Sequence, residues 1–139
     1  MSGWAALRRH LLPYRKGGAP LYSAVVGDLL NGRRVIESLV DGRIDVGPLD
    51  SYYHDLLKAH EPEFASRVRA VATTESAPIP PLVSTAKLGA GELEKFRTAL
   101  LDGGGAPTLL LKGFSVPREA DYTVFDSILA AAAEQPGVW

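Results

Sequence analysis

Apolar side chains recur at helical spacing in several stretches of the chain, each bounded by glycine, proline or polar residues. This spacing puts them on one face, which is typical of an amphipathic helix packed on a core. We expect helices over residues 4–12, 33–42, 51–59, 92–101 and 120–133. A further helical turn is expected after Glu61, and Gly42 suits the left-handed end of a helix.

Runs of β-branched and apolar residues between these helices favour extended backbone. They cover residues 21–26, 44–49, 67–74 and 82–85. The run 44–49 has the pattern of a strand buried on both faces, which indicates a parallel sheet with helical crossovers. The expected fold class is therefore α/β, with a small, mostly parallel sheet flanked by helices.

The stretch 75–81 is the clearest boundary in the chain. Pro78, Pro80 and Pro81 make it an extended and fairly stiff connector. We therefore expect an α/β domain over residues 1–78 and a return segment over residues 79–139.

Composition excludes several classes of protein. With 139 residues, 46% of them hydrophobic, the chain suits one domain or two very small ones. A net charge of -1 gives no reason to expect nucleic acid or a polybasic membrane patch, and the absence of cysteine excludes thiolate chemistry. The first residues lack the regions of a signal peptide, and no apolar run is long enough to span a bilayer.

Catalytic and metal-binding motifs are not found. His10, His54 and His60 show no spacing typical of metal ligands. The chain has no nucleophile elbow, glycine-rich phosphate loop or paired-carboxylate motif. We therefore expect neither an enzyme nor a cofactor.

Polar residues at the expected helix starts are candidates for anion binding. The free N–H groups and the dipole of the first helix favour an anion at Ser2 and Gly3. An ordinary helix cap is the alternative. Arg33 and Arg34 suit bidentate binding of phosphate or carboxylate. Solvated arginines are the alternative.

Asp50 and Ser51 follow the expected strand 44–49, where ligands bind in open α/β sheets. An Asp N-cap satisfies the same geometry, and both interpretations stay open. Tyr52 is a candidate for lining a pocket or for core packing. Thr74 and Glu75 lie at the end of another expected strand, on the same ligand-binding side.

The order of these features resembles the periplasmic phosphate/phosphite/phosphonate-binding proteins of ABC transporters. The matching parts, in chain order, are Ser2-Gly3, residues 21–26, Arg33-Arg34, residues 40–50 and residues 74–80. The helix 93–101 and Asp121-Tyr122 resemble the closing segments of the family. The resemblance covers nearly the whole chain, and its specificity lies in order and spacing.

The resemblance implies a type II periplasmic-binding-protein fold, with two α/β lobes around a cleft, that binds a small oxyanion such as phosphate or phosphonate. Ser2, Gly3 and the N–H groups that follow, including that of Trp4, would hold the oxygens. Asp50 would contact the ligand, and Thr74-Glu75 would lie at the hinge. An ABC permease is the implied partner, and the periplasm is the implied location.

The sequence departs from the family before Ser2, where family members carry most of the first lobe. The resemblance makes residues 1–78 the second lobe and residues 79–139 the return into the first. We therefore expect exposed apolar faces over residues 82–139 that pack on the second lobe or on another copy of the chain, giving a homo-oligomer. The alternative function is a regulatory or oligomerisation module that keeps the fold and has lost transport. A sulfonate or a thiamine-pyrimidine precursor is another possible ligand. A chain complete as written would be cytoplasmic.

Overall fold

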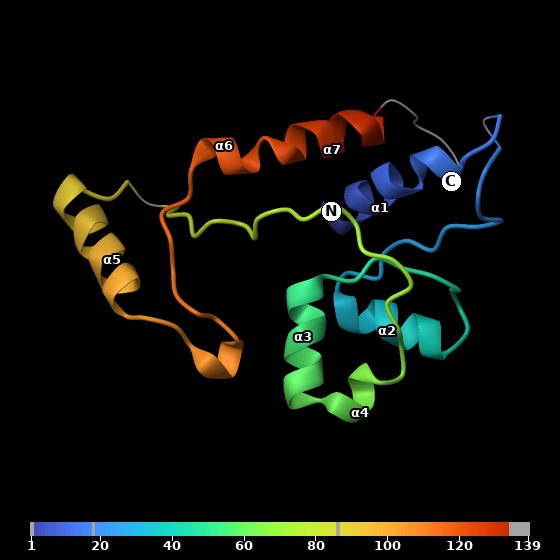
Figure 1. The fold of residues 1–139 in the computed structure, drawn as a ribbon, viewed down its shortest axis with the longest axis horizontal. Helices are drawn as coiled ribbons and strands as arrows, with labels where there is room; N and C mark the ends of the chain where they lie inside the picture. Colours follow the sequence, from blue (N-terminus) through green and yellow to red (C-terminus); the bar gives the residue numbers. More distant parts are fainter. Residues whose placement is uncertain (1, 18, 86, 134–139) are drawn as a thin grey trace. The chain divides into compact units, whose positions relative to one another are not determined.

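A computed structural model describes residues 2–17, 19–85 and 87–133, apart from the side chains of Ser2, Ala131 and Ala132. The chain forms two compact units, one of residues up to Ser76 together with the last helix, and one of Ala77–Thr123. The helical elements, shown in Figure 1, are α1 (Ser2–Leu11), η1 (Leu12–Tyr14), α2 (Gly32–Val40), α3 (Ser51–His60), α4 (Pro62–Ala65), α5 (Ala90–Asp102), η2 (Pro107–Leu109), α6 (Glu119–Tyr122) and α7 (Val124–Ala133).

The α/β prediction is wrong. Within the described residues there is no sheet, and the strand-like pairing consists of an isolated antiparallel bridge between Ala106 and Leu111. The described segments predicted as strands are turns, bends or chain without regular secondary structure, and none of them pairs in a sheet. A preference for strands reflects the fit of a side chain to a half-buried pleated surface. Val25, Val71 and Val83 are instead 51%, 64% and 80% exposed.

The predicted helices are confirmed, with small shifts at their ends and one break. The helix expected over residues 120–133 is divided into α6 and α7 at Thr123. The first helix ends before Pro13, which lies in the 3-10 turn η1. Local periodicity and capping residues were therefore sufficient to locate the helices.

A left-handed turn at Gly42 ends α2. Gly42 has a φ of +68°, and its amide bonds to the Leu39 carbonyl at 3.2 Å. The Arg43 amide bonds to the Ser38 carbonyl at 2.9 Å, which completes a Schellman motif. These bonds satisfy carbonyls that the end of a helix otherwise leaves without partners.

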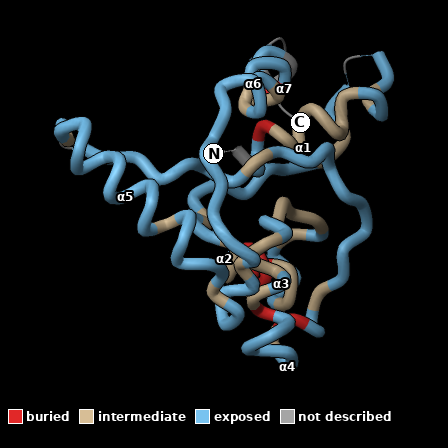
Figure 2. Tube along the Cα trace, turned by 60° about the vertical axis from the view of Figure 1, so that its left-hand side comes forward, coloured by how far each residue is buried: buried red, intermediate tan, exposed pale blue. Residues whose placement is uncertain are grey.

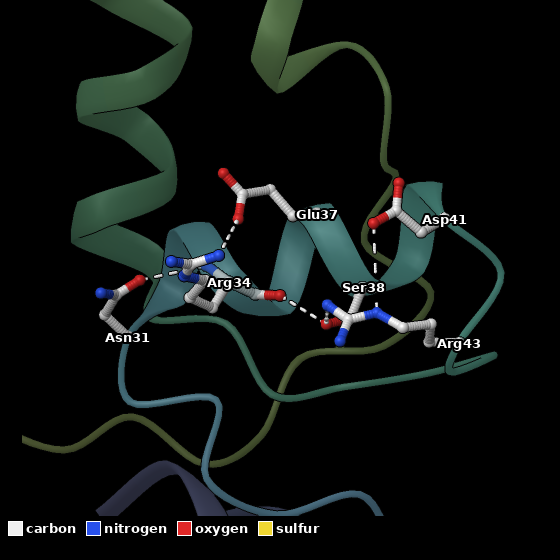
Figure 3. A network of polar contacts seen from close by, with 6 residues as sticks. All are labelled: Asn31, Arg34, Glu37, Ser38, Asp41 and Arg43. Atoms are coloured by element: carbon white, nitrogen blue, oxygen red, sulfur yellow. Dashed lines mark hydrogen bonds and ion pairs between the residues drawn. The ribbon is translucent and has the colours of Figure 1, made fainter.

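Side chains reinforce this turn (Figure 3). The fully buried Ser38 hydroxyl donates to the Arg34 carbonyl and accepts from the Arg43 guanidinium, both at 2.7 Å. Arg43 Nε also lies 4.0 Å from a carboxylate oxygen of Asp41. The chain leaving α2 is thus tied back to the helix, and the buried hydroxyl has both a donor and an acceptor.

The core of the first unit lies among α2, α3 and α4, where buried positions gather in Figure 2. Its centre is formed by Ile36, Leu57 and Ala65. The partly buried apolar residues around this centre are Val40, Leu49, Tyr53, Phe64 and Val68. In the same unit α1 packs along α7, and Arg9 donates to the Ser127 hydroxyl at 2.6 Å.

The second unit, Ala77–Thr123, has few buried side chains. Leu82, Val83 and Phe96 are 75%, 80% and 62% exposed. Arg118 donates to both carboxylate oxygens of Asp121, and this hydrogen bonding lowers the pKa of Asp121. The predicted division at residues 78 and 79 into two family-like lobes stays a prediction.

Replacing Gly42 tests the turn after α2. We expect Gly42→Ala to lower the free energy of unfolding by about 1–2 kcal/mol, because a Cβ atom is disfavoured at positive φ. No atom lies within 4 Å of the added Cβ, so strain is the cause. Gly27→Ala is the control, since Gly27 has equal space and no positive φ. Equal stability of the two variants in urea unfolding would contradict the left-handed turn.

Candidate functional site

The first turns of α2 and α3 are in contact in the first unit, and the chain just before α3 lies beside the first turn of α1. A Cβ atom on Gly3 in α1 would lie 3.6 Å from Cβ of Pro48, just before α3. A Cβ atom on Gly32, the first residue of α2, would lie 2.7 Å from the ring of Tyr53 in α3. The first contact places the segment that precedes α3 beside the start of α1, and the second places the first turn of α3 beside the start of α2.

Backbone N–H groups are the main polar feature of this region. The first amides of a helix have no acceptor within the helix. Asn31 Oδ1 accepts from the Arg34 amide at 3.0 Å, and caps α2. Within the described residues, the amides of Gly32 and Ser51 donate to no acceptor. They can therefore donate to an anion, which the positive ends of the helix dipoles also favour.

Asp50 is the N-cap of α3. Its Oδ1 accepts from the Tyr53 amide at 2.7 Å, and the His54 amide bonds to its carbonyl at 3.0 Å. Asp50 and Ser51 are exposed, whereas Tyr52 is half-buried. The cap occupies one carboxylate oxygen of Asp50.

Arg33 is held by an ion pair. One of its terminal nitrogens lies 2.5 and 2.6 Å from the two carboxylate oxygens of Glu61, and its guanidinium lies 4.4 Å from the centre of the Phe64 ring. The hydrogen bond to Glu61 is the largest cause that raises the pKa of Arg33. Arg33 thus fastens α2 to the α3–α4 junction. Arg34 is exposed and lies 3.4 Å from Glu37.

The other predicted site residues lie apart or away from this region. Glu75 pairs with Arg9 at 2.9 Å, towards the far end of α1 from Gly3, and the neighbouring Thr74 is exposed. Trp4 lies 5.7 Å from the Arg8 guanidinium in a cation–π contact. The side chain of Ser2 lies outside the described residues. Among the described residues, the structure therefore brings Gly3 beside Pro48, two positions before Asp50, and the start of α2 beside the first turn of α3, which contains Ser51.

Two residues of this region were not singled out from sequence. Asn31 could have been, because Asn is a favoured N-cap and directly precedes the predicted helix. Glu61 had no local signal, since Arg33, its partner, is 28 positions away.

Comparison with known families assigns the chain to a protein family. The family model for the phosphonate periplasmic substrate-binding protein of ABC transporters matches residues 1–125. The chain belongs to this family. The predicted resemblance is therefore confirmed, and the family is one of periplasmic substrate-binding proteins rather than enzymes. Neither a curated protein nor a solved structure matches the chain.

Two further observations concern the described residues as a whole. No helix among residues 2–17, 19–85 and 87–133 combines the length and apolar character needed to cross a membrane. The same residues contain no group of three or more His, Cys, Asp and Glu side chains that could hold a metal ion. Backbone amides at helix starts remain the polar groups best placed for a small anion.

Substitution of Asp50 tests the cap of α3. We expect Asp50→Ala to lower the free energy of unfolding by about 1 kcal/mol, because the Tyr53 amide loses its acceptor. Asp50→Asn keeps an acceptor oxygen and should stay within a few tenths of a kcal/mol of the parent. Chemical denaturation of the three proteins measures this. An unchanged stability of Asp50→Ala would show that the cap contributes nothing.

Proposed function

We propose that the chain binds a small phosphorus oxyanion, phosphate or a phosphonate, as the substrate-binding component of an ABC transporter. The proposed site is formed by the N-terminal ends of α1, α2 and α3. The observation that supports the proposal is the contact of Gly32 with the first turn of α3, together with the contact of Gly3 with Pro48 just before α3, in a member of this family.

Helix starts suit the chemistry of such a ligand. Hydrogen bonds from N–H groups to anionic oxygens are short and about twice as strong as neutral ones. The aligned helix dipoles add positive potential without a free cation. Arg33 is neutralised by Glu61, so the site relies on amides, in keeping with a net charge of -1. Such a site can bind an anion and also release it.

Asp50 would distinguish among oxyanions. Its Oδ1 accepts from the Tyr53 amide, and its other carboxylate oxygen can accept a hydrogen bond from the ligand. A hydrogen phosphate or hydrogen phosphonate carries an O–H group that can donate there. Sulfate carries none at neutral pH and would be repelled by the carboxylate. We therefore propose a preference for phosphorus over sulfur oxyanions.

The remaining predicted residues complete this proposal. Ser2, Trp4 and Tyr52 adjoin the proposed amides in sequence and are proposed as further contacts. Arg34 would add positive charge near the start of α2. Thr74 and Glu75 remain the predicted hinge, and a homo-oligomer also stays a prediction. The proposed partner is the permease of the transporter.

A thermal-shift titration with methylphosphonate, 2-aminoethylphosphonate, phosphate and sulfate tests the proposed function. Ligand at about 100 times its dissociation constant adds about 2.7 kcal/mol of stability, which raises the melting temperature by several degrees. We expect such a shift with a phosphorus oxyanion and none with sulfate. Ser51→Pro should weaken binding about tenfold or more, because it removes one N–H donor to a charged ligand.

Ser51→Pro is a structurally mild change. Proline is favoured at the first position of a helix, and Asp50, with φ -65° and ψ 127°, has the extended backbone required before proline. Ser51→Ala, which keeps the amide and lacks the hydroxyl, is the matched control. Equal affinities of these two variants would contradict a role for the amide.

The same titration separates the proposal from its alternatives. A shift with sulfonates and none with phosphorus oxyanions would overturn the ligand class. No shift with any anion at millimolar concentration would overturn the binding function. That result would favour a regulatory or oligomerisation module, for which the exposed Leu82, Val83 and Phe96 are the supporting observation.

A further inference from the structure

A groove on the first unit lies apart from the proposed oxyanion site. Its volume is about 330 Å³, within the range of small-molecule sites. The groove is formed by α3, α4 and the chain that follows α4. Its lining residues are His54, Lys58, Pro62, Ala65, Ser66, Val68, Arg69 and Ala70. Of these lining residues, His54 lies in the first turn of α3, and the others lie outside the helix starts of the proposed oxyanion site.

The charged groups that line the groove are cationic. Arg69 contributes a full positive charge, Lys58 contributes an ammonium group that is paired with Asp55 at 2.9 Å, and no Asp or Glu is among the lining residues. His54 and Lys58 are one helical turn apart on α3, so their side chains lie on the same face. Arg69 reaches the groove from the chain after α4. Lys58 on α3 and Arg69 on the chain after α4 therefore both border the groove.

Lys58 and Arg69 each have N–H donors that are not used in hydrogen bonds with the described residues. Lys58 donates one hydrogen bond to Asp55 at 2.9 Å, and an ammonium group carries further N–H donors. Arg69 is exposed and makes no hydrogen bond or ion pair with the described residues. Its planar guanidinium is suited to bidentate binding of a carboxylate. The charge of the groove is thus complementary to an anionic group.

The remaining lining is largely aliphatic. Pro62, Ala65 and Val68 present carbon atoms to the groove, and Val68 packs on the core centred on Ile36. A bare inorganic anion would use the charges and leave this aliphatic surface in water. An apolar group attached to the anion would cover it, which is favourable in proportion to the area removed from water.

We propose that this groove binds a small organic anion, with a carboxylate head at Lys58 and Arg69 and a short aliphatic body on Pro62, Ala65 and Val68. The inference does not depend on the proposed oxyanion function. It gives the chain a second ligand site, with side-chain cations in place of helix-start amides.

A nuclear magnetic resonance titration of the ¹⁵N-labelled full chain with hexanoate tests this proposal. Hexanoate should shift the amide signals of residues 54–70 in a saturable manner. Lys58→Ala and Arg69→Ala should each weaken binding roughly fivefold, as expected for exposed charge pairs. Arg67→Ala is the matched control, because Arg67 is an exposed cation of the same segment that does not line the groove. Its affinity should equal that of the parent.

Two comparison ligands make the outcome decisive. Hexan-1-ol has the same body without the charge, and inorganic phosphate has charge without the body. Both should bind in the groove at least about tenfold more weakly than hexanoate. Equal binding of hexan-1-ol would overturn the role of the cations, and equal binding of phosphate would overturn the organic ligand. An equal loss of affinity in Arg67→Ala, or no saturable shift in residues 54–70, would overturn the site.

Discussion

Close packing of Gly32 against Tyr53 brings the starts of α2 and α3 together. A Cβ atom at position 32 would lie 2.7 Å from the tyrosine ring and 3.0 Å from a methyl group of Leu49, so glycine is required for this approach. The ion pair of Arg33 with Glu61, above the Phe64 ring, holds the same helices on their other side. The buried Ile36 and Leu57 then form the core beneath this contact.

The charged groups at the starts of α2 and α3 determine the electrostatic potential at the proposed oxyanion site. The nearest cation, Arg33, is occupied by Glu61, and Asp50 supplies a negative charge at the start of α3. Positive potential therefore comes from amide groups at helix ends, whose charge is partial and fixed in direction. The groove between α3 and α4 differs, because its positive charge is carried by side chains and the rest of its lining is largely aliphatic. The two surfaces should select anions of different kinds.

The sequence was most informative where structure depends on near neighbours. The helices followed from apolar spacing, the cap at Asp50 from its position before Ser51, and the left-handed end from Gly42. The family followed from the order of short motifs along the chain. All of these features are encoded within a few residues, or in their linear order.

Features that depend on distant partners were not predicted correctly. The runs 21–26, 44–49, 67–74 and 82–85 prefer extended backbone, but a strand exists only with a neighbour to pair with, and the described chain provides no sheet. The pairing of Arg33 with Glu61 and the approach of Gly3 to Pro48 also join segments far apart in sequence. Gly3 and Ser51 were therefore named as candidates from local sequence, whereas the contacts of Gly3 with Pro48 and of Gly32 with Tyr53 required the tertiary structure.

The central claim is that the helix starts act together on a single anion. The most direct measurement follows the backbone amide signals of Gly3, Gly32 and Ser51 while methylphosphonate is added to the ¹⁵N-labelled chain. The account predicts that all of them move downfield, as expected for N–H groups that donate to an anion, and that they give the same dissociation constant. Signals that do not move, or that move with different midpoints, would contradict a shared oxyanion site.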